Sequence, residues 1–210
     1  MNLAVLLFSS AAAGAIIDRI AVSVGSQVIT LRDVEREVRV TAFLDAVQPV
    51  LSASNKRATA DRMVEEKLIR QEMETSHFPL PAAAEVQPML DRLKKNFPSE
   101  ADYQRALAQY GITESDVRDQ LLRMLTLQEF LSLRFRPGVQ VADQDIRDYF
   151  DRTVAPAARA AHPGQPVELK DYRTQIEEKL TGERADQELD NWLKEARKRT
   201  EIVIHPEALE

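Results

Sequence analysis

Histidine is the side chain of this sequence best suited to acid–base or metal chemistry, because its pKa lies near neutral pH. The sequence has three: His77, His162 and His205. They are far apart in the chain and each stands close to a proline-containing break. These positions favour exposed loop residues over the alternatives, a metal site or a catalytic base.

Paired carboxylates are the second kind of residue that can carry chemistry. Asp143 and Asp145 suggest a cation site, but two acids in the first turn of a helix also stabilise the helix dipole, and we favour that interpretation. The pairs Glu65-Glu66 and Glu177-Glu178 face different sides of a helix, and we expect them to be solvated.

Motifs that specify a reaction are missing from the sequence. It contains no Gly-x-Ser-x-Gly elbow, no phosphate-binding P-loop, no Gly-x-Gly-x-x-Gly and no His-Glu-x-x-His. It has no Cys, which excludes disulfides, thiolate nucleophiles and Cys-ligated zinc. We therefore predict no catalytic residue, no cofactor and no metal ligand.

The charge balance argues against general nucleic-acid binding. The 210 residues include 28 Lys and Arg against 34 Asp and Glu, giving a net charge of −6, whereas phosphate binding needs a basic face. The basic cluster of Lys194, Arg197, Lys198 and Arg199 falls in the last turn of an expected helix, where cations complement the dipole. A share of 44% apolar and 30% charged residues predicts a globular protein.

The N-terminal residues have the pattern of a secretory signal. Residues 1–17 carry no charge, and the apolar run Leu3–Phe8 precedes the small residues Ala11–Ala15. Cleavage after Ala13 or Ala15 fits this pattern and predicts an exported, soluble periplasmic protein. The alternative is a hydrophobic N-terminal helix that packs on the domain. The apolar run is shorter than the roughly 20 residues of a membrane span, so we expect no stable span after cleavage.

Short strands are expected near both ends of the chain. Ile20, Val22 and Val24 alternate with smaller or polar residues, and Gly25-Ser26 supplies a two-residue hairpin turn. A β-branched segment, 201–205, is stopped by Pro206. An isolated hairpin is marginal in water, so we predict that the last strand pairs with the hairpin in one small three-stranded sheet.

Helices are expected over most of the remaining chain. Thr30 with Asp33, Ser99 with Asp102, and Thr113 with Asp116 have the spacing of N-terminal caps, and Gly111 suits a left-handed C-terminal position. The predicted helices begin after Thr30 and cover about 58–76, 82–96, 99–110, 113–135, 143–150 and 167–200. The most apolar of them, 113–135, is expected to be central. The Pro- and Ala-rich segment 152–166 is interpreted as a linker.

The order of these elements resembles the N-terminal module of the SurA-type periplasmic chaperones. The resemblance lies in "IIDRIAVSVGSQVITLRDVE", "RMVEEKLIRQEM", "SEADYQRALAQYGITESDVRDQLLRMLTLQEFL", "VADQDIRDYFD" and "YRTQIEEKLTGERADQELDNWLKEARKRTEIVI", and covers nearly all of 16–207. It implies a mainly α, SurA N-terminal-like (trigger-factor C-terminal-like) chaperone module at 16–210, with a small sheet formed by the N-terminal hairpin and the C-terminal strand. The signal peptide would occupy 1–15.

One departure from the family bears on function. The family carries a parvulin-type prolyl isomerase domain where this chain has only 152–166, too few residues for a domain. The resemblance therefore implies an ATP-independent holdase, not an enzyme, whose partners are unfolded polypeptides, including outer-membrane protein precursors. The alternatives are a degenerate peptidyl-prolyl isomerase and a non-chaperone module that docks one envelope partner.

Client-binding residues are expected among apolar side chains at helix ends and on helix faces. Phe78, Leu80 and Phe97 stand at helix ends, where an apolar side chain can remain exposed for a client. Met89 lies on a helix face, and the flexible Met side chain adapts to varied partners. Ordinary core packing is the alternative for the methionines.

Overall fold

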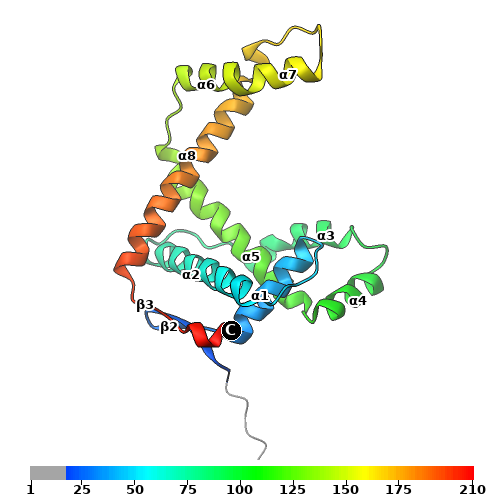
Figure 1. Cartoon of the computed structure of the whole chain (residues 1–210), viewed down its shortest axis with the longest axis vertical. Helices are drawn as coiled ribbons and strands as arrows, with labels where there is room; N and C mark the ends of the chain where they lie inside the picture. The colour runs from blue at the N-terminus through cyan, green and yellow to red at the C-terminus, as the bar shows by residue number, and fades with distance from the viewer. Residues whose placement is uncertain (1–17) are drawn as a thin grey trace, which may run out of the picture.

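The sheet joins the two ends of the described chain. The computed structural model describes residues 18–210, so the predicted signal peptide lies outside the described residues. Strands β1 (Ile20–Val24), β2 (Gln27–Thr30) and β3 (Ile202–Ile204) form an antiparallel sheet in the order β2-β1-β3. Val24 is paired with Ile202 and Val22 with Ile204. This confirms the predicted pairing of the hairpin with the C-terminal strand (Figure 1).

The hairpin departs from its predicted alternation at one end. Ala21, Val22 and Val24 are buried, whereas Ile20 is exposed. The register shifts between Ile20 and Val22, as at a β-bulge, and a bulge places neighbouring side chains on the same face. The period-two alternation seen in the sequence therefore does not extend to the burial of Ile20.

Helices make up most of the molecule, which is mainly α as predicted. Three of the helices begin at the predicted caps: the side chains of Thr30, Ser99 and Thr113 accept hydrogen bonds from the backbone of Asp33, Asp102 and Asp116. Gly111 closes α4 with a φ of 66°. The helices are α1 (Leu31–Leu44), α2 (Ala53–Thr75), α3 (Gln87–Lys94), α4 (Glu100–Tyr110), α5 (Glu114–Phe130), α6 (Asp143–Tyr149), α7 (Ala155–Ala161) and α8 (Leu169–Arg199).

Two helix boundaries differ from those predicted. Helix α2 begins five residues earlier than expected, because Ser52 caps it by accepting a hydrogen bond from the Asn55 amide. The predicted helix 82–96 is divided into a 3-10 turn, Ala83–Val86, and α3. Pro88 in the first turn of α3 has no N–H to donate, so the change of helix type falls where a donor is missing.

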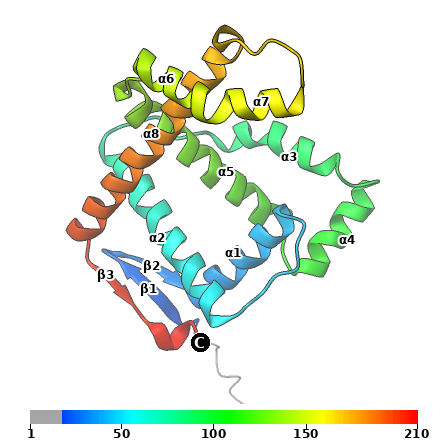
Figure 2. The same cartoon turned by 45° about the horizontal axis from the view of Figure 1, so that its top comes forward.

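Helix α5 lies at the centre of the fold, between α1, α2 and α3 (Figure 2). It continues through a π-helical turn, Leu131–Phe135, to the predicted end. Its cover is incomplete: Leu121 and Phe130 are buried, but Leu122 and Leu127 are only half-buried and Met124 is 48% exposed. The central position was predicted correctly, whereas the expected cover on most sides is incomplete at these three apolar side chains.

The segment interpreted as a linker is largely helical. A π-helical turn, Phe150–Val154, leads directly into α7, and only residues 162–168 between α7 and α8 lack helix. Pro156 stands in the first turn of α7, where proline is tolerated, and the Ala residues after it favour helix. The linker prediction was wrong for residues 152–161.

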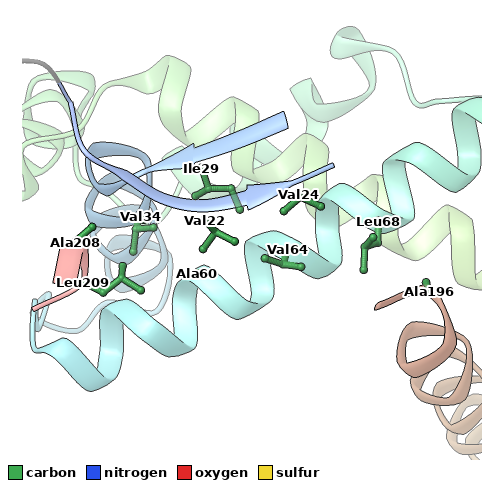
Figure 3. Close-up of a cluster of buried hydrophobic side chains, with 11 residues drawn as sticks. Val22, Val24, Ile29, Val34, Ala60, Val64, Leu68, Ala196, Ala208 and Leu209 are labelled. Carbon is green, nitrogen blue, oxygen red and sulfur yellow. The ribbon is translucent and has the colours of Figure 1, made fainter. Parts of the chain in front are cut away.

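Helix α8 connects two parts of unequal size (Figure 1). We call residues 18–138 and 184–210, which hold the sheet, α1 to α5 and the C-terminal half of α8, the body. We call α6, α7 and the N-terminal half of α8 the arm. In the body, Val22, Val24 and Ile29 of the sheet pack on Ala60 and Val64 of α2 (Figure 3). Ala196 of α8 and Leu209 complete this cluster.

Candidate functional site

The predicted client-binding residues do not come together. Phe78 packs edge-on against the buried Phe130, with ring centroids 6.5 Å apart. Phe97 stacks on Phe43 at 5.9 Å, and Met89 packs against the same cluster. Leu80 is exposed. Phe78 and Phe97 thus belong to two different hydrophobic clusters, and of the four only Leu80 is classed as exposed, with about a third of its surface accessible (36%).

An open cleft lies instead between α2 and α5. Its volume is about 390 Å³, and its apolar wall consists of Met63 and Ile69 from α2 with Leu122 and Leu127 from α5. All four side chains line the same hollow between the two helices, so they face one groove. The apolar face that α5 leaves uncovered therefore borders a hollow.

A second hollow of about 250 Å³ adjoins the cleft towards the sheet. It is lined by Val28 of β2, by Glu37 and Val40 of α1, and by residues of α2 and α5. Met63, Lys67, Asp119 and Arg123 line both hollows. The two hollows are therefore neighbours that share part of their walls, and we call them together the α2–α5 cleft.

Arg123 of α5 links three helices at the floor of this cleft. Its guanidinium donates to the Glu37 carboxylate of α1 and to the Gln120 side chain of α5. Its Nε lies 3.1 Å from Oε2 of Glu66 in α2 but has no aligned hydrogen bond. Two carboxylates therefore share one guanidinium. Glu37 is almost fully buried, with 5% of its side chain exposed.

Glu66 is the most perturbed acid of the described chain. Burial raises the pKa of its carboxyl to about 7, and the attraction of Arg123, which acts in the opposite direction, does not offset it. Only 27% of its side chain is exposed. The prediction that the Glu65-Glu66 pair is solvated was therefore wrong for Glu66. The sequence of α2 does not indicate that Glu66 is buried, because the residues beside its carboxyl, Glu37 and Arg123, lie on α1 and α5.

The cations that line the cleft are engaged with other groups. Lys67 donates to the Gln27 side chain at 3.0 Å, and Arg70 pairs with Glu74 at 3.0 Å. Asp119, by contrast, is exposed and makes no hydrogen bond or ion pair with any residue from 18 to 210. Among the described residues, the Asp119 carboxylate and the Lys67 ammonium, which meets only a neutral amide, are thus unpaired charges of the cleft, and Glu66 shares Arg123 with Glu37.

The arm contains a separate groove of about 430 Å³ between α7 and α8. It is lined mainly by apolar or small groups, among them Val154, Ala158 and Ile176, with Tyr149 and Tyr172 at its sides. Its cation, Lys179, is paired with Glu183 at 2.8 Å. This groove offers apolar surface without the charged floor of the α2–α5 cleft.

The remaining candidates for chemistry stay separate. His77 and His162 are exposed, and His205 lies 3.5 Å from Glu207. Asp145 caps α6 by accepting from the Ala142 amide at 3.0 Å, which agrees with the helix-terminus interpretation. Between residues 18 and 210, no three His, Asp or Glu side chains form a group that could hold a metal ion. None of the helices in this range is both long and apolar enough for a membrane crossing.

No protein-family model matches the sequence, and no curated protein matches it significantly.

Proposed function

We propose that this protein is an ATP-independent periplasmic holdase that binds extended segments of unfolded polypeptides, including outer-membrane protein precursors. The observation that carries the proposal is the α2–α5 cleft, an open hollow with apolar side chains on two facing helices. An exposed apolar groove on a helical scaffold is a common mode of peptide recognition.

The proposed mechanism is reversible burial of client apolar side chains. Met63, Leu122 and Leu127 would exchange contact with water for contact with the client, at roughly 25 cal/mol per Å² of apolar surface buried. Binding the unfolded form lowers its free concentration by mass action and so slows aggregation. This needs no nucleotide and no covalent step.

The resemblance to the SurA-type chaperones supports the same proposal. In that family the parvulin domain stands between the elements that correspond to α6 and α8. In this chain α7 and the segment 162–168 occupy that place. We therefore propose a holdase without prolyl isomerase activity, and a proline-peptide isomerisation assay with measurable turnover would contradict this part.

Aggregation suppression tests the main proposal. Light scattering of a denatured outer-membrane β-barrel protein, diluted into buffer with or without the mature chain (residues 16–210), should show slower aggregation with the chain present. Replacing Leu122 and Leu127 by Ser should weaken the effect severalfold, because a buried Leu side chain contributes about 2 kcal/mol or less to such contacts. Leu51→Ser, an exposed Leu outside the cleft, is the matched control.

Two outcomes would overturn the proposal. One is aggregation that the wild-type chain leaves unchanged. The other is suppression that the cleft variant retains in full, provided that circular dichroism shows it to be folded. A panel of unrelated unfolded clients adds a further check, since a module that docks one fixed partner would ignore most of them.

A further inference from the structure

We propose that the α2–α5 cleft selects client segments in which a basic residue stands among apolar ones, with the cation held by Glu66 and Asp119. This inference rests on the proposed client binding and names the chemistry of the segment that the cleft prefers. The apolar wall would receive the neighbouring side chains, and the charged floor would receive the Lys or Arg head group.

The charge of the cleft is the first argument. Arg123 is shared between Glu37 and Glu66, so one guanidinium faces two carboxylates. Asp119 adds a third carboxylate, without a partner among the described residues. Arg70 is paired with Glu74, whereas Lys67, which lines both hollows, donates only to the neutral Gln27 side chain and keeps its charge. Three carboxylates, those of Glu37, Glu66 and Asp119, therefore face the two cations Arg123 and Lys67, and a client cation meets a net negative charge.

The shape of the cleft is the second argument, independent of charge. Glu66 lies on the same helix as Met63 and Ile69, and all three line one hollow. Long basic side chains bury their methylene stems along apolar surface while the charged head remains at a polar group. A groove with apolar walls and a carboxylate at its floor fits both parts of such a side chain.

The protonation of Glu66 gives the proposal a pH signature. The charged groups that act on its carboxyl include Glu37 of α1, Arg62 and Glu65 of α2, and Arg123 of α5. Lys67, Arg70 and Asp119 line the same hollow. Burial keeps Glu66 partly protonated near neutral pH. A client cation favours the ionised form, so its binding must release a proton at pH values below the pKa. Affinity for a basic segment should therefore rise from pH 5.5 to pH 8.

Matched peptides test the selectivity directly. The exported chain is titrated with a short capped peptide of alternating apolar residues that carries one central Arg, and with the same peptide carrying citrulline or Glu instead. Citrulline keeps the shape of Arg and removes its charge. We expect the Arg peptide to bind about tenfold more tightly than the citrulline peptide, a typical effect of one partly desolvated charge pair, and the Glu peptide to bind most weakly.

Charge-neutralising variants locate the effect. In Glu66→Gln the preference for Arg over citrulline and its pH dependence should both disappear, and in Asp119→Asn the preference should fall in part. Asp186→Asn, an exposed acid of α8 that lines none of these hollows, makes the same change in net charge and should keep the full preference. Thermal melts confirm that each variant is folded.

The possible failures are distinguishable. If wild-type protein binds the Arg and citrulline peptides equally, or if Glu66→Gln keeps the preference, the inference is wrong while client holding stands. If no peptide binds and aggregation is not suppressed, the proposed function itself fails. If Asp186→Asn loses the preference as well, the effect comes from net charge and not from the cleft.

Discussion

The body and the arm are built from the same kind of helix but are held together differently. Three of the four buried clusters lie in the body, each assembled from segments distant in sequence. The arm has one small cluster around Ile146, Phe150 and Ile176. Its links to the body include exposed ion pairs such as Arg136 with Glu178 and Arg184 with Asp145. Exposed ion pairs contribute little to stability.

This contrast indicates where the molecule can open. Local unfolding occurs where few apolar contacts are buried, so we expect the arm to open at a lower free energy than the body. The α2–α5 cleft, which belongs to the body, would then remain formed while the arm moves. The two regions should therefore respond differently to substitutions, to truncation and to pH.

Removal of residues 201–210 should have the largest effect. It deletes β3 and the buried Leu209, and leaves the hairpin without its third strand. We expect a loss of about 3 kcal/mol or more in the free energy of unfolding, because a hairpin alone is marginally stable. The measurement is urea denaturation followed by circular dichroism. An unchanged midpoint would show that the sheet does not hold the body together.

Phe130→Ala should be the most damaging single substitution among those considered. The Phe130 ring is fully buried between Phe78, Phe135 and Trp192, with centroids at 5.1–6.5 Å. Removing a buried Phe side chain costs about 3–5 kcal/mol, and the whole body should lose stability together. Urea denaturation measures the cost. A loss below about 1 kcal/mol would mean that this junction of α5 with α8 is loosely packed.

Ile176→Ala tests whether the arm unfolds by itself. Ile176 is the buried α8 residue of the arm cluster, and its truncation should cost about 2–3 kcal/mol there. If the arm opens independently, hydrogen exchange should speed up in α6 and α7 while amides of α1 and α2 keep their protection. Equal loss of protection in both regions would show that the arm and the body unfold together as one cooperative unit, contrary to the proposed difference between them.

Glu66→Gln should change how the stability of the body depends on pH. The folded chain raises the pKa of Glu66 from 4.5 to about 7, so the native state keeps a proton that the unfolded chain releases. This carboxyl therefore contributes stability at low pH that is lost as pH rises from about 4.5 to 7. The Gln variant lacks this loss. The difference in free energy of unfolding between the Gln variant and wild type should therefore shift in favour of the variant by up to about 2–3 kcal/mol from pH 5 to pH 8.

Denaturant midpoints of both proteins at pH 5 and pH 8 give this difference. Titrations that both proteins share cancel in the comparison. The contribution of Glu114 to stability changes over a different pH range. The hydrogen bond from Lys94 lowers the pKa of Glu114, so its contribution is lost only as pH falls through the acid range. Identical pH profiles for the two proteins would mean that Glu66 is hydrated in solution.

Local rules predicted the parts of this fold that depend on neighbouring residues. The caps at Thr30, Ser99 and Thr113 and the left-handed Gly111 involve groups within a few positions of one another. The pairing of β3 with the hairpin was also predictable, because an unpaired strand and an isolated hairpin have the same need for a partner. In each case a physical requirement visible in the sequence could be met in only one simple way.

The features that the sequence did not predict depend mainly on packing between segments that are distant in the chain. The burial of Glu66 depends on Arg123 and Glu37, which lie on other helices, and no spacing in α2 indicates them. Leu122 and Leu127 of α5 were expected to be covered, but they are only half-buried. The sequence shows that these positions are apolar, but it does not show which other helices pack against them. Helix α7 was missed because Pro156 was read as a break, although it stands where a helix begins.

Two glycine substitutions should give the smallest effects, and of opposite sign. Gly111 in the body has a φ of 66°, so Gly111→Ala should cost about 1 kcal/mol through backbone strain alone, as an added Cβ meets nothing within 4 Å. Gly182 lies inside α8, close to the junction of the arm with the body, and is equally free of neighbours. Gly182→Ala should therefore stabilise α8 by about 0.5–1 kcal/mol, because Ala favours helix over Gly. If α8 couples the two regions, thermal melts and hydrogen exchange of Gly182→Ala should show slower opening of the arm, whereas Gly111→Ala should weaken the body and leave the arm unchanged.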